Sequence, residues 1–411
     1  MRLWHQRMIR LASAVVLFVS FGPPTVGQPA GSIPWQEFSD EAFARAKREG
    51  RLVLLDLGAV WCHWCHVMEQ TTYRDPTVVA LVSGHFVAVR VDQDARPDLS
   101  NRYEDYGWPA TVIFDATGKE LVKFSGYVPP PRMISLLQAV IDDPTPGPSA
   151  RALAPSRLAQ ASAPVGLSLS PKLLGELERL LVERYDEEHA GTKGQHAAEY
   201  FALPDAERRR LGIPRVDTHV YTRETAWAAY GLLALHEATG DAAYRREAEH
   251  AARFLLARRA LGGGGFTHAA ADAAGPYLGD TLFAGRLFLG LHAATGEPGW
   301  LEHAEAAARF IDARFRRSGT TGFVTAAAGS AFAPPLPQRE ENAVLARFAN
   351  LLFRYTGHEA YRASAREAFA FLSIPEVARR FSTASVLLAD LELRTAPPHV
   401  TRVEPRDDPI P

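Results

Sequence analysis

The spacing of hydrophobic residues along the chain changes near residue 150. Before that point, short apolar runs alternate with stretches of helical spacing. The run Leu52–Leu55 is apolar without interruption, which is typical of a strand buried on both faces of a parallel sheet. Residues 33–143 are therefore predicted to form an α/β domain. Its strands are expected at 51–57, 86–91, 110–114 and 121–125, and its helices at 42–48, 61–70 and 132–141.

The second half of the chain has a different pattern. Residues 144–168 are rich in proline, alanine and serine, which predicts a linker. Residues 171–395 have helical spacing, and the strand signal disappears. Three stretches repeat the order helix, Thr-Gly, aromatic residue, helix, with the glycines at Gly240, Gly296 and Gly357 and the aromatic residues at Tyr244, Trp300 and Tyr361. A single hairpin cannot bury its apolar face, so we expect the hairpins to stack into an array or ring, with the aromatic residues in its packing.

The two ends of the chain predict segments outside these domains. Arg2, Arg7 and Arg10 precede an apolar run at 11–21, a pattern typical of a secretory signal over residues 1–27. The run is shorter than the roughly 20 residues that span a bilayer, although an uncleaved signal would still serve as an anchor. We therefore expect a periplasmic or secreted protein without a further membrane span. Residues 396–411 are polar and proline-rich, and are predicted to be a loose tail.

Composition narrows the classes of function. Hydrophobic residues make up 47% of the chain and charged residues 22%, which excludes disorder over most of its length. The formal net charge of −2 gives no indication of nucleic-acid binding. The chain has two cysteines, Cys62 and Cys65. A disulfide between them closes only a very small loop and adds little stability, so a chemical role is the better interpretation.

The two cysteines follow a predicted buried strand and begin a predicted helix. A helix N-terminus stabilises a thiolate, so we expect a lowered pKa for Cys62. Cys65, one turn further and on the inner side, is predicted to be the resolving thiol. Asp56 is a carboxylate within the apolar strand, where burial is costly, and a role as proton acceptor for Cys65 would explain it. Pro109 precedes another strand, where a cis peptide bond would bring the backbone beside the cysteines.

Neighbouring residues are predicted to contribute to the same site. His63, when protonated, would stabilise the Cys62 thiolate, although an exposed polar residue at a helix start is an equally good interpretation. Trp61 is expected to shield the disulfide and to pack on the sheet. Trp108 is either a core residue or a platform for a polypeptide substrate. No metal site or cofactor is predicted.

Together these residues resemble a known family. Asp56, the Trp61-Cys-x-x-Cys65 motif and Pro109 are similar to the thioredoxin superfamily. WCHWCHVME and GWPATVIFDATGKEL resemble, more narrowly, the thioredoxin-like domain of the spermatogenesis-associated protein 20 family. That resemblance implies a thioredoxin-like domain followed by an α/α-toroid of the six-hairpin-glycosidase type. This chain has about four hairpins, so the toroid is expected to be incomplete.

Other interpretations of the cysteines remain open. Cys62-His63-Trp64-Cys65-His66 also matches the C-x-x-C-H attachment motif of c-type haem. Two thiolates and two imidazoles also suit zinc, although their closeness on one helical turn makes tetrahedral binding awkward. An inert structural disulfide is the third alternative.

We expect a thiol-disulfide oxidoreductase that acts on protein thiol or disulfide partners and exchanges electrons with a redox partner. The helical domain would select the partner or substrate. The alternative is a carbohydrate-binding or carbohydrate-active toroid, in which paired carboxylates act on a sugar. His268 and Asp280 are the first pair to test for that activity, and the other candidate acids are Asp186, Glu187, Glu188, Glu340 and Glu341. Solvated acids at helix ends are the simpler interpretation.

Overall fold

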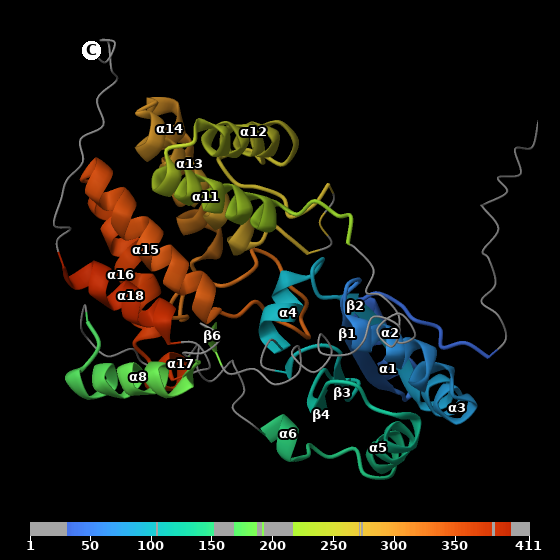
Figure 1. Cartoon of the computed structure of the whole chain (residues 1–411). Helices are drawn as coiled ribbons and strands as arrows, with labels where there is room; N and C mark the ends of the chain where they lie inside the picture. The colour runs from blue at the N-terminus through green and yellow to red at the C-terminus, as the bar shows by residue number, and fades with distance from the viewer. Residues whose placement is uncertain are drawn as a thin grey trace, which may run out of the picture.

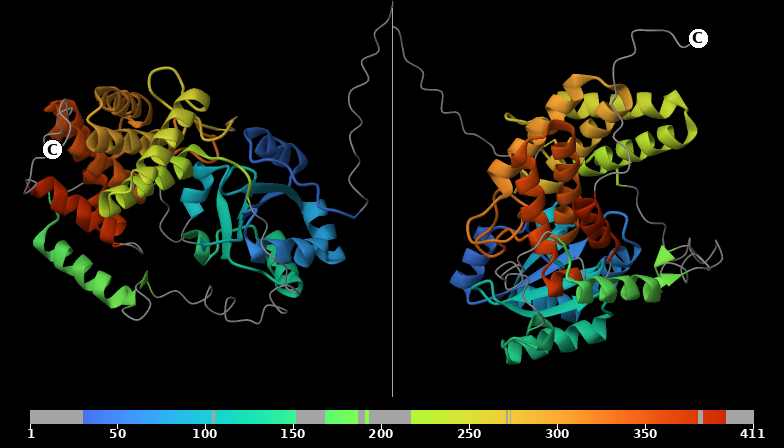
Figure 2. Two further views of the ribbon diagram at one scale, coloured as in Figure 1. Left: turned by 45° about the horizontal axis from the view of Figure 1, so that its top comes forward. Right: turned by 90° about the vertical axis from the view of Figure 1, so that its left-hand side faces the viewer.

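The structure is a computed structural model. It describes residues 31–103, 106–151, 168–186, 191–192, 217–270, 272, 274–379 and 383–395. The predicted signal at 1–27, the predicted tail at 396–411 and the acids Glu187 and Glu188 lie outside these residues. Figures 1 and 2 show two regions: an N-terminal α/β region in blue to teal, and a helical region in yellow to red.

A four-stranded sheet with the order β2-β1-β3-β4 forms the centre of the N-terminal domain. β1 pairs parallel with β2 and antiparallel with β3, and β3 pairs antiparallel with β4. The strands are β1 (Leu52–Gly58), β2 (Phe86–Asp92), β3 (Ala110–Phe114) and β4 (Glu120–Ser125). Each predicted strand is present, and the apolar run of β1 is buried as expected.

Helices cover both faces of this sheet. α1 (Asp40–Glu49) and α4 (Pro97–Tyr103) contribute Phe43 and Leu99 to the core on one face. α2 (His63–Gln70), α3 (Pro76–His85) and α5 (Pro130–Asp142) contribute to the core on the other. The sequence analysis predicted α1, α2 and α5 but neither α3 nor α4. The predicted linker begins with contacts to β4, since Gly147 N–H donates to the Leu121 carbonyl, and the short α6 (Pro148–Arg151) follows.

The helical domain consists mainly of three helical hairpins. They are α11 (Thr222–Thr239) with α12 (Ala242–Arg258), α13 (Leu278–Thr295) with α14 (Pro298–Phe315), and α15 (Arg339–Thr356) with α16 (Glu359–Leu372). Among the described residues, the other helices of this domain are α8 (Pro171–Arg184), α17 (Pro375–Ala378) and α18 (Ala384–Arg394). A two-stranded ladder that was not predicted joins β5 (Tyr185–Asp186) to β6 (Gly191–Thr192). α11, α13, α15 and α18 form a row of neighbours, with α12, α14 and α16 outside it. This is the predicted all-α hairpin repeat of an incomplete toroid.

The repeated residues explain the hairpins. Gly240, Gly296 and Gly357 each follow the first helix with φ between 72° and 74°, the left-handed region that glycine adopts without strain. Trp300 and Tyr361 are buried, as expected for packing residues, and Trp300 stacks on Phe288. The apolar faces of the hairpins therefore form one continuous core.

The two domains are packed against each other. Phe332, from the loop before α15, stacks on Phe43 of α1 with ring centroids 4.2 Å apart, and Ala333 joins the same core. Gly118 lies so close to Phe332 that a Cβ there would be 2.5 Å from the ring. On α4, Asn101 donates to Thr325 Oγ1 at 3.1 Å. The helical domain therefore covers the face of the sheet that carries α1 and α4.

Candidate functional site

The two cysteines lie where β1 ends and α2 begins. Cys62 is the N-cap of α2, and its Sγ accepts a hydrogen bond from the Cys65 N–H at 3.1 Å. The sulfurs form a disulfide with an S–S distance of 2.03 Å. The first turn of α2 has no acidic residue, so no carboxylate there offsets the positive end of the helix dipole. The predicted placement at a helix N-terminus is confirmed.

The backbone of β1 leaves room for the second sulfur. A Cβ at Gly58 would lie 3.3 Å from Cys65 Sγ, so Cys65 faces the end of the strand, on the predicted inner side. An attacking Cys62 would be expected to be the more exposed of the two cysteines, but it is the less exposed one. Cys62 is only 5% exposed in the disulfide form, whereas Cys65 is partly exposed. A reacting thiol can therefore reach Cys62 Sγ only if the surrounding residues give it access.

Asp56 is a buried carboxylate on β1 with two partners. Arg90 Nε donates to Oδ2 at 3.0 Å, and Tyr73 O–H donates to Oδ1 at 3.2 Å. Burial raises the pKa of Asp56, and the charge of Arg90 offsets this only in part. Side chains two apart on a strand point to the same face, so Asp56 lies on the same side of β1 as the Cβ direction of Gly58, toward Cys65. The role of proton acceptor stays a prediction.

Pro109 lies directly before β3. The Trp108–Pro109 peptide bond is cis, as expected. Ala110, the next residue, pairs with Leu57 at the end of β1, so the loop before β3 and the Cys motif share one edge of the sheet. The Pro109 carbonyl accepts the Gly126 N–H at 2.8 Å. Trp108 is partly buried against the core under α1.

Two exposed tryptophans flank the disulfide. Trp61 and Trp64 are each 45% exposed. The expectation that Trp61 packs on the sheet is wrong, because its Nε1 instead donates to Asp94 Oδ2 at 2.7 Å in the loop after β2. Trp64 stacks on Tyr127, and His63 lies edge-on to Trp64 at 5.3 Å. These rings provide an exposed aromatic surface around the cysteines.

A cleft of about 420 Å³ separates this surface from the helical domain. Trp61 and Asp94 line it on one side, and Asp217, His219, Val220, Tyr221, Glu224 and Thr225 line it on the other. Burial raises the pKa of Asp94, and Asp92, Glu224 and Asp217 nearby raise it further. The residues before and within α11 were missed by sequence reasoning. No motif marks them, since only the packing of the domains brings them next to Trp61.

The structure brings together the predicted pair His268 and Asp280, but at the boundary between the domains. His268 Nδ1 contacts Asp280 Oδ1 at 2.8 Å, and His268 Nε2 contacts the Asp94 carbonyl oxygen at 2.6 Å. Burial disfavours the charged imidazole, but the hydrogen bond and charge of Asp280 outweigh it, so the pKa of His268 is raised. Asp280 Oδ1 also accepts the Arg223 N–H at 3.0 Å, which caps α11. The pair thus connects the loop after β2, which contains Asp94, to the helical domain.

Glu341 and Glu340, two of the other predicted acids, have structural partners. Glu341 is 5% exposed, and its Oε2 accepts from Thr325 Oγ1 at 2.5 Å. Glu340 pairs with Arg339 at 2.7 Å, and Asp186 lies in β5. Within the described ranges no group of three or more His, Cys, Asp or Glu side chains is placed to hold a metal ion. Because Cys62 and Cys65 are joined to each other, neither is available to zinc or to a haem vinyl group in this state.

Comparison with known proteins agrees with this topology. Residues 27–141 match the Thioredox_DsbH family, described as "Protein of unknown function, DUF255". Human spermatogenesis-associated protein 20 is 34% identical over 88 residues, which are 20% of this chain and 11% of that protein. The thiol:disulfide interchange protein DsbD 2 of Pseudomonas aeruginosa is 35% identical over 99 residues, which are 23% of this chain and 16% of that protein.

Two solved structures are similar to parts of the chain. A thioredoxin from Thermus thermophilus is 27% identical and covers 27% of this chain and 88% of its own, with a TM-score of 0.25. The GH76 α-mannanase BT2949 of Bacteroides thetaiotaomicron is 15% identical and covers 44% of this chain and 55% of its own, with a TM-score of 0.36.

The sheet order, the cis proline and the Cys pair define a thioredoxin-like domain, which is here joined to an incomplete α/α-toroid. Residues 27–141 match the Thioredox_DsbH family, and, as predicted, part of the chain is similar to spermatogenesis-associated protein 20. The chain matches only a small part of the length of these relatives. Among the described residues, no helix has the length and apolar character needed to cross a bilayer.

Proposed function

We propose that this protein is a thiol-disulfide oxidoreductase that acts on protein partners in an exported compartment. The observation that supports it most is the Cys62–Cys65 disulfide at the N-terminus of α2, beside the cis bond before Pro109. A thiolate at this position gains the helix dipole and the Cys65 N–H, both of which favour the charged form. Similarity to thiol:disulfide interchange proteins over the same domain supports the same class.

The exchange balances with two cysteines and one partner. In the reducing direction, the Cys62 thiolate attacks a partner disulfide, one partner sulfur leaves as a thiolate, and a mixed disulfide forms. Cys65, after losing its proton to Asp56, attacks Cys62 Sγ and expels the second partner sulfur. Two electrons pass to the partner, which takes up two protons as a dithiol, and the Cys62–Cys65 disulfide remains. A dithiol carrier protein then reduces this disulfide. Oxidation of a partner is the same sequence reversed.

The surface around the cysteines would bind the partner chain. Trp61, Trp64 and His63 present exposed or partly exposed rings on one side, and Trp108 and Pro109 provide backbone and a ring on the other. The cleft beside Trp61 gives the helical domain a direct part in selection, because Tyr221 and Glu224 line it. An exported location rests on the predicted signal at residues 1–27.

Trapping experiments test the proposal. In full-length protein, Cys65→Ala removes the resolving thiol, so mixed disulfides with protein partners should accumulate on Cys62. Cys62→Ala is the matched control and should capture none. If Cys65→Ala captures no partner from an exported fraction and the wild type does not reduce insulin, the oxidoreductase proposal is wrong. The redox potential then assigns direction, because about 30 mV corresponds to a tenfold change in the equilibrium.

The carbohydrate alternative receives less support from the geometry. Asp280 and Glu341 are 1% and 5% exposed and are held by His268 and Thr325, at the end of the helices that the thioredoxin-like domain covers. A sugar would have to displace that contact to reach them. A glycan-binding screen on the full chain decides this point: binding that is lost in Asp280→Asn would restore the alternative.

A further inference from the structure

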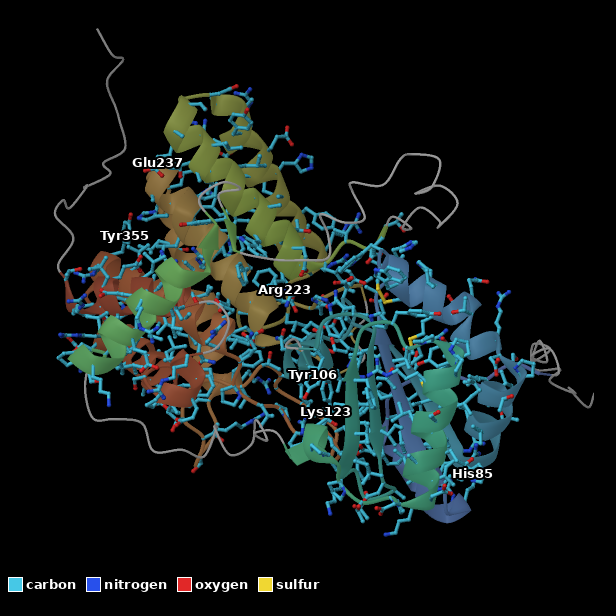
Figure 3. All side chains as sticks on the ribbon, turned by 60° about the horizontal axis from the view of Figure 1, so that its bottom comes forward. His85, Tyr106, Lys123, Arg223, Glu237 and Tyr355 are labelled. Atoms are coloured by element: carbon cyan, nitrogen blue, oxygen red, sulfur yellow. A yellow bond between two sulfur atoms is a disulfide. The ribbon has the colours of Figure 1, made fainter. Side chains whose placement is uncertain are left out.

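The helical domain holds a second cavity, separate from the cysteines. Its volume is about 650 Å³, within the range of pockets that bind small molecules. It lies between the C-terminal halves of α11, α13 and α15 and the end of α18. Figure 3 shows Glu237, which lines it, at the opposite end of α11 from Arg223 beside the thioredoxin-like domain. The cavity is therefore remote from the disulfide.

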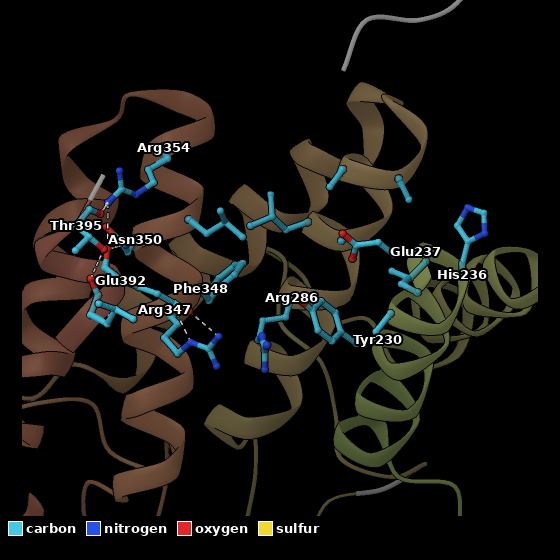
Figure 4. A pocket seen from close by; sticks show the side chains of 18 residues that line it. Tyr230, His236, Glu237, Arg286, Arg347, Phe348, Asn350, Arg354, Glu392 and Thr395 are labelled. Atoms are coloured by element: carbon cyan, nitrogen blue, oxygen red, sulfur yellow. Dashed lines mark hydrogen bonds and ion pairs between the residues drawn. The ribbon is translucent and has the colours of Figure 1, made fainter. Parts of the chain in front are cut away.

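Arg286 of α13 points into this cavity, as Figure 4 shows. Its guanidinium lies over the ring of Tyr230, 4.6 Å from the centroid, and 5.8 Å from that of Phe283. Within the described part of the chain no carboxylate forms an ion pair with Arg286. Burial lowers the pKa of Arg286 most and Arg347 lowers it further, while Tyr230 and Glu392 offset this in part. Its positive charge is thus partly removed from water without a paired carboxylate, which is costly unless a ligand supplies one.

The neighbouring charges compensate Arg286 only in part. Glu392 is engaged with Arg347, whose Nε and NH2 donate to its two oxygens at 2.9 and 2.7 Å. Arg354 donates to the main-chain carbonyls of Glu392 and Thr395 at 3.1 and 2.7 Å. The lining contains these three arginines and two glutamates, Glu237 and Glu392, so positive charge is in excess. The planar fork of a guanidinium suits a carboxylate or phosphate group.

The rest of the lining is apolar. Leu351 of α15 and Leu391 of α18 are 44% and 46% exposed, and both face the cavity. Leu233, Leu289 and Phe348 extend this surface between the helices. Large apolar side chains that line a concave site gain when a ligand removes them from water. The site therefore combines a cationic group with an apolar wall.

We propose that this cavity binds an amphipathic organic anion, a small molecule with one carboxylate or phosphate group and an apolar body. Arg286 binds the anionic group, with its guanidinium held flat by Tyr230. Glu392 keeps Arg347 in place beside it, and Leu351 and Leu391 contact the apolar body. This site is independent of the thiol chemistry.

Calorimetry on the full-length oxidised protein tests the proposal with octanoate, mono-octyl phosphate and 1-octanol as probes. The two anions should bind, and 1-octanol should bind at least tenfold more weakly than the better of them. The tighter-binding anion shows whether the site prefers a carboxylate or a phosphate group. The proposal is overturned if neither anion binds, or if 1-octanol binds as tightly as they do.

Substitutions at two positions, Arg286 and Ala294, locate the site. Arg286→Gln should weaken binding of the anion by tenfold or more and leave 1-octanol unaffected, while Arg286→Lys should restore part of the affinity. Arg362→Gln, which removes an arginine of α16 paired with Glu359, is the matched control and should change nothing. Ala294→Trp narrows the cavity without altering charge and should weaken all three probes. Unchanged affinity in folded Arg286→Gln or in Ala294→Trp contradicts the proposal; circular dichroism verifies folding.

Discussion

Asp56 and Asp280 are buried carboxylates with cationic partners, one in each domain, and their surroundings differ. Asp56 of the thioredoxin-like domain is 6% exposed and pairs with Arg90. Asp280 of the helical domain is 1% exposed and pairs with His268. Asp56 lies on the side of β1 that faces Cys65, whereas Asp280 caps α11 and holds a histidine that reaches the neighbouring domain.

The comparison shows that burial and a charged partner do not identify a catalytic acid. Both carboxylates have raised pKa values because burial disfavours their charge. What distinguishes them is the reactive atom nearby: Asp56 has a sulfur on its side of the strand, and Asp280 has a backbone N–H and an imidazole. We therefore expect substitutions of Asp56 to change rates and those of Asp280 to change stability.

The largest effect is expected for Asp280→Ala. Loss of one partner from a buried ion pair costs about 3–5 kcal/mol, because the other charge stays buried without compensation. The free energy of unfolding, from urea denaturation with the disulfide intact, measures it. Asp312→Ala, at an exposed pair with Arg316, is the control and should cost less than about 1 kcal/mol. Equal losses in the two variants would mean that the pair of Asp280 and His268 is not stabilising.

Asp56→Asn should slow thiol-disulfide exchange with little effect on folding. The amide cannot accept the Cys65 proton, and loss of general base catalysis costs about a hundredfold in rate. Stopped-flow reduction of a disulfide substrate measures the rate, and the trapping of partners by Cys62 should persist. Asp142→Asn, at the exposed end of α5, is the control. A rate unchanged by Asp56→Asn would assign Asp56 the same structural role as Asp280.

The stability of the contact between the domains should depend on pH through His268. Its pKa in the folded protein is raised above the ordinary 6.5, because both of its nitrogens contact oxygen acceptors. The stabilisation is therefore complete below pH 6.5 and is lost as the pH rises through the folded value. Denaturation of wild type and His268→Gln from pH 5 to 9 measures it. Their difference in unfolding free energy should shrink with rising pH; a constant difference would contradict it.

The smallest effect is expected for Trp61→Phe. A smaller aromatic ring remains and the hydrogen bond from Nε1 to Asp94 is lost, which costs about 1 kcal/mol. Thermal unfolding measures the stability, and partner trapping by the Cys65→Ala variant measures selection. We expect a small decrease in melting temperature and a weaker preference among partners. Trp64→Phe, whose ring stacks on Tyr127, is the matched control. Identical partners in both variants would show that the cleft does not select.

Much of the fold could be predicted because local patterns agree with it. The apolar run of β1 occupies the centre of the sheet, and the three Thr-Gly motifs end helices as predicted. α3 was missed because its apolar residues at 78–82 carry no clear helical period, although Asp75 caps it. The Cys motif could be assigned to a helix N-terminus because strand, motif and helix are adjacent in sequence.

The residues that surround the cysteines from distant parts of the chain could not be predicted in the same way. Asp94 lies 174 residues before His268, and nothing in the local sequence links them. Trp61 was expected on the sheet, but the loop after β2 offers Asp94 as an acceptor, which keeps the ring at the surface. Arg286 has no motif, and its importance depends on which carboxylates lie near it.

The sequence by itself determined most of the elements, the thioredoxin-like class and the place of Cys62 and Cys65, because helix caps, strand patterns and adjacent residues act over a few positions. Only the tertiary structure decided which acids are used for packing, which surface faces the disulfide and where a charge stays uncompensated. Those properties depend on distances between residues far apart in the chain, and such distances are set by the packing of two cores against each other.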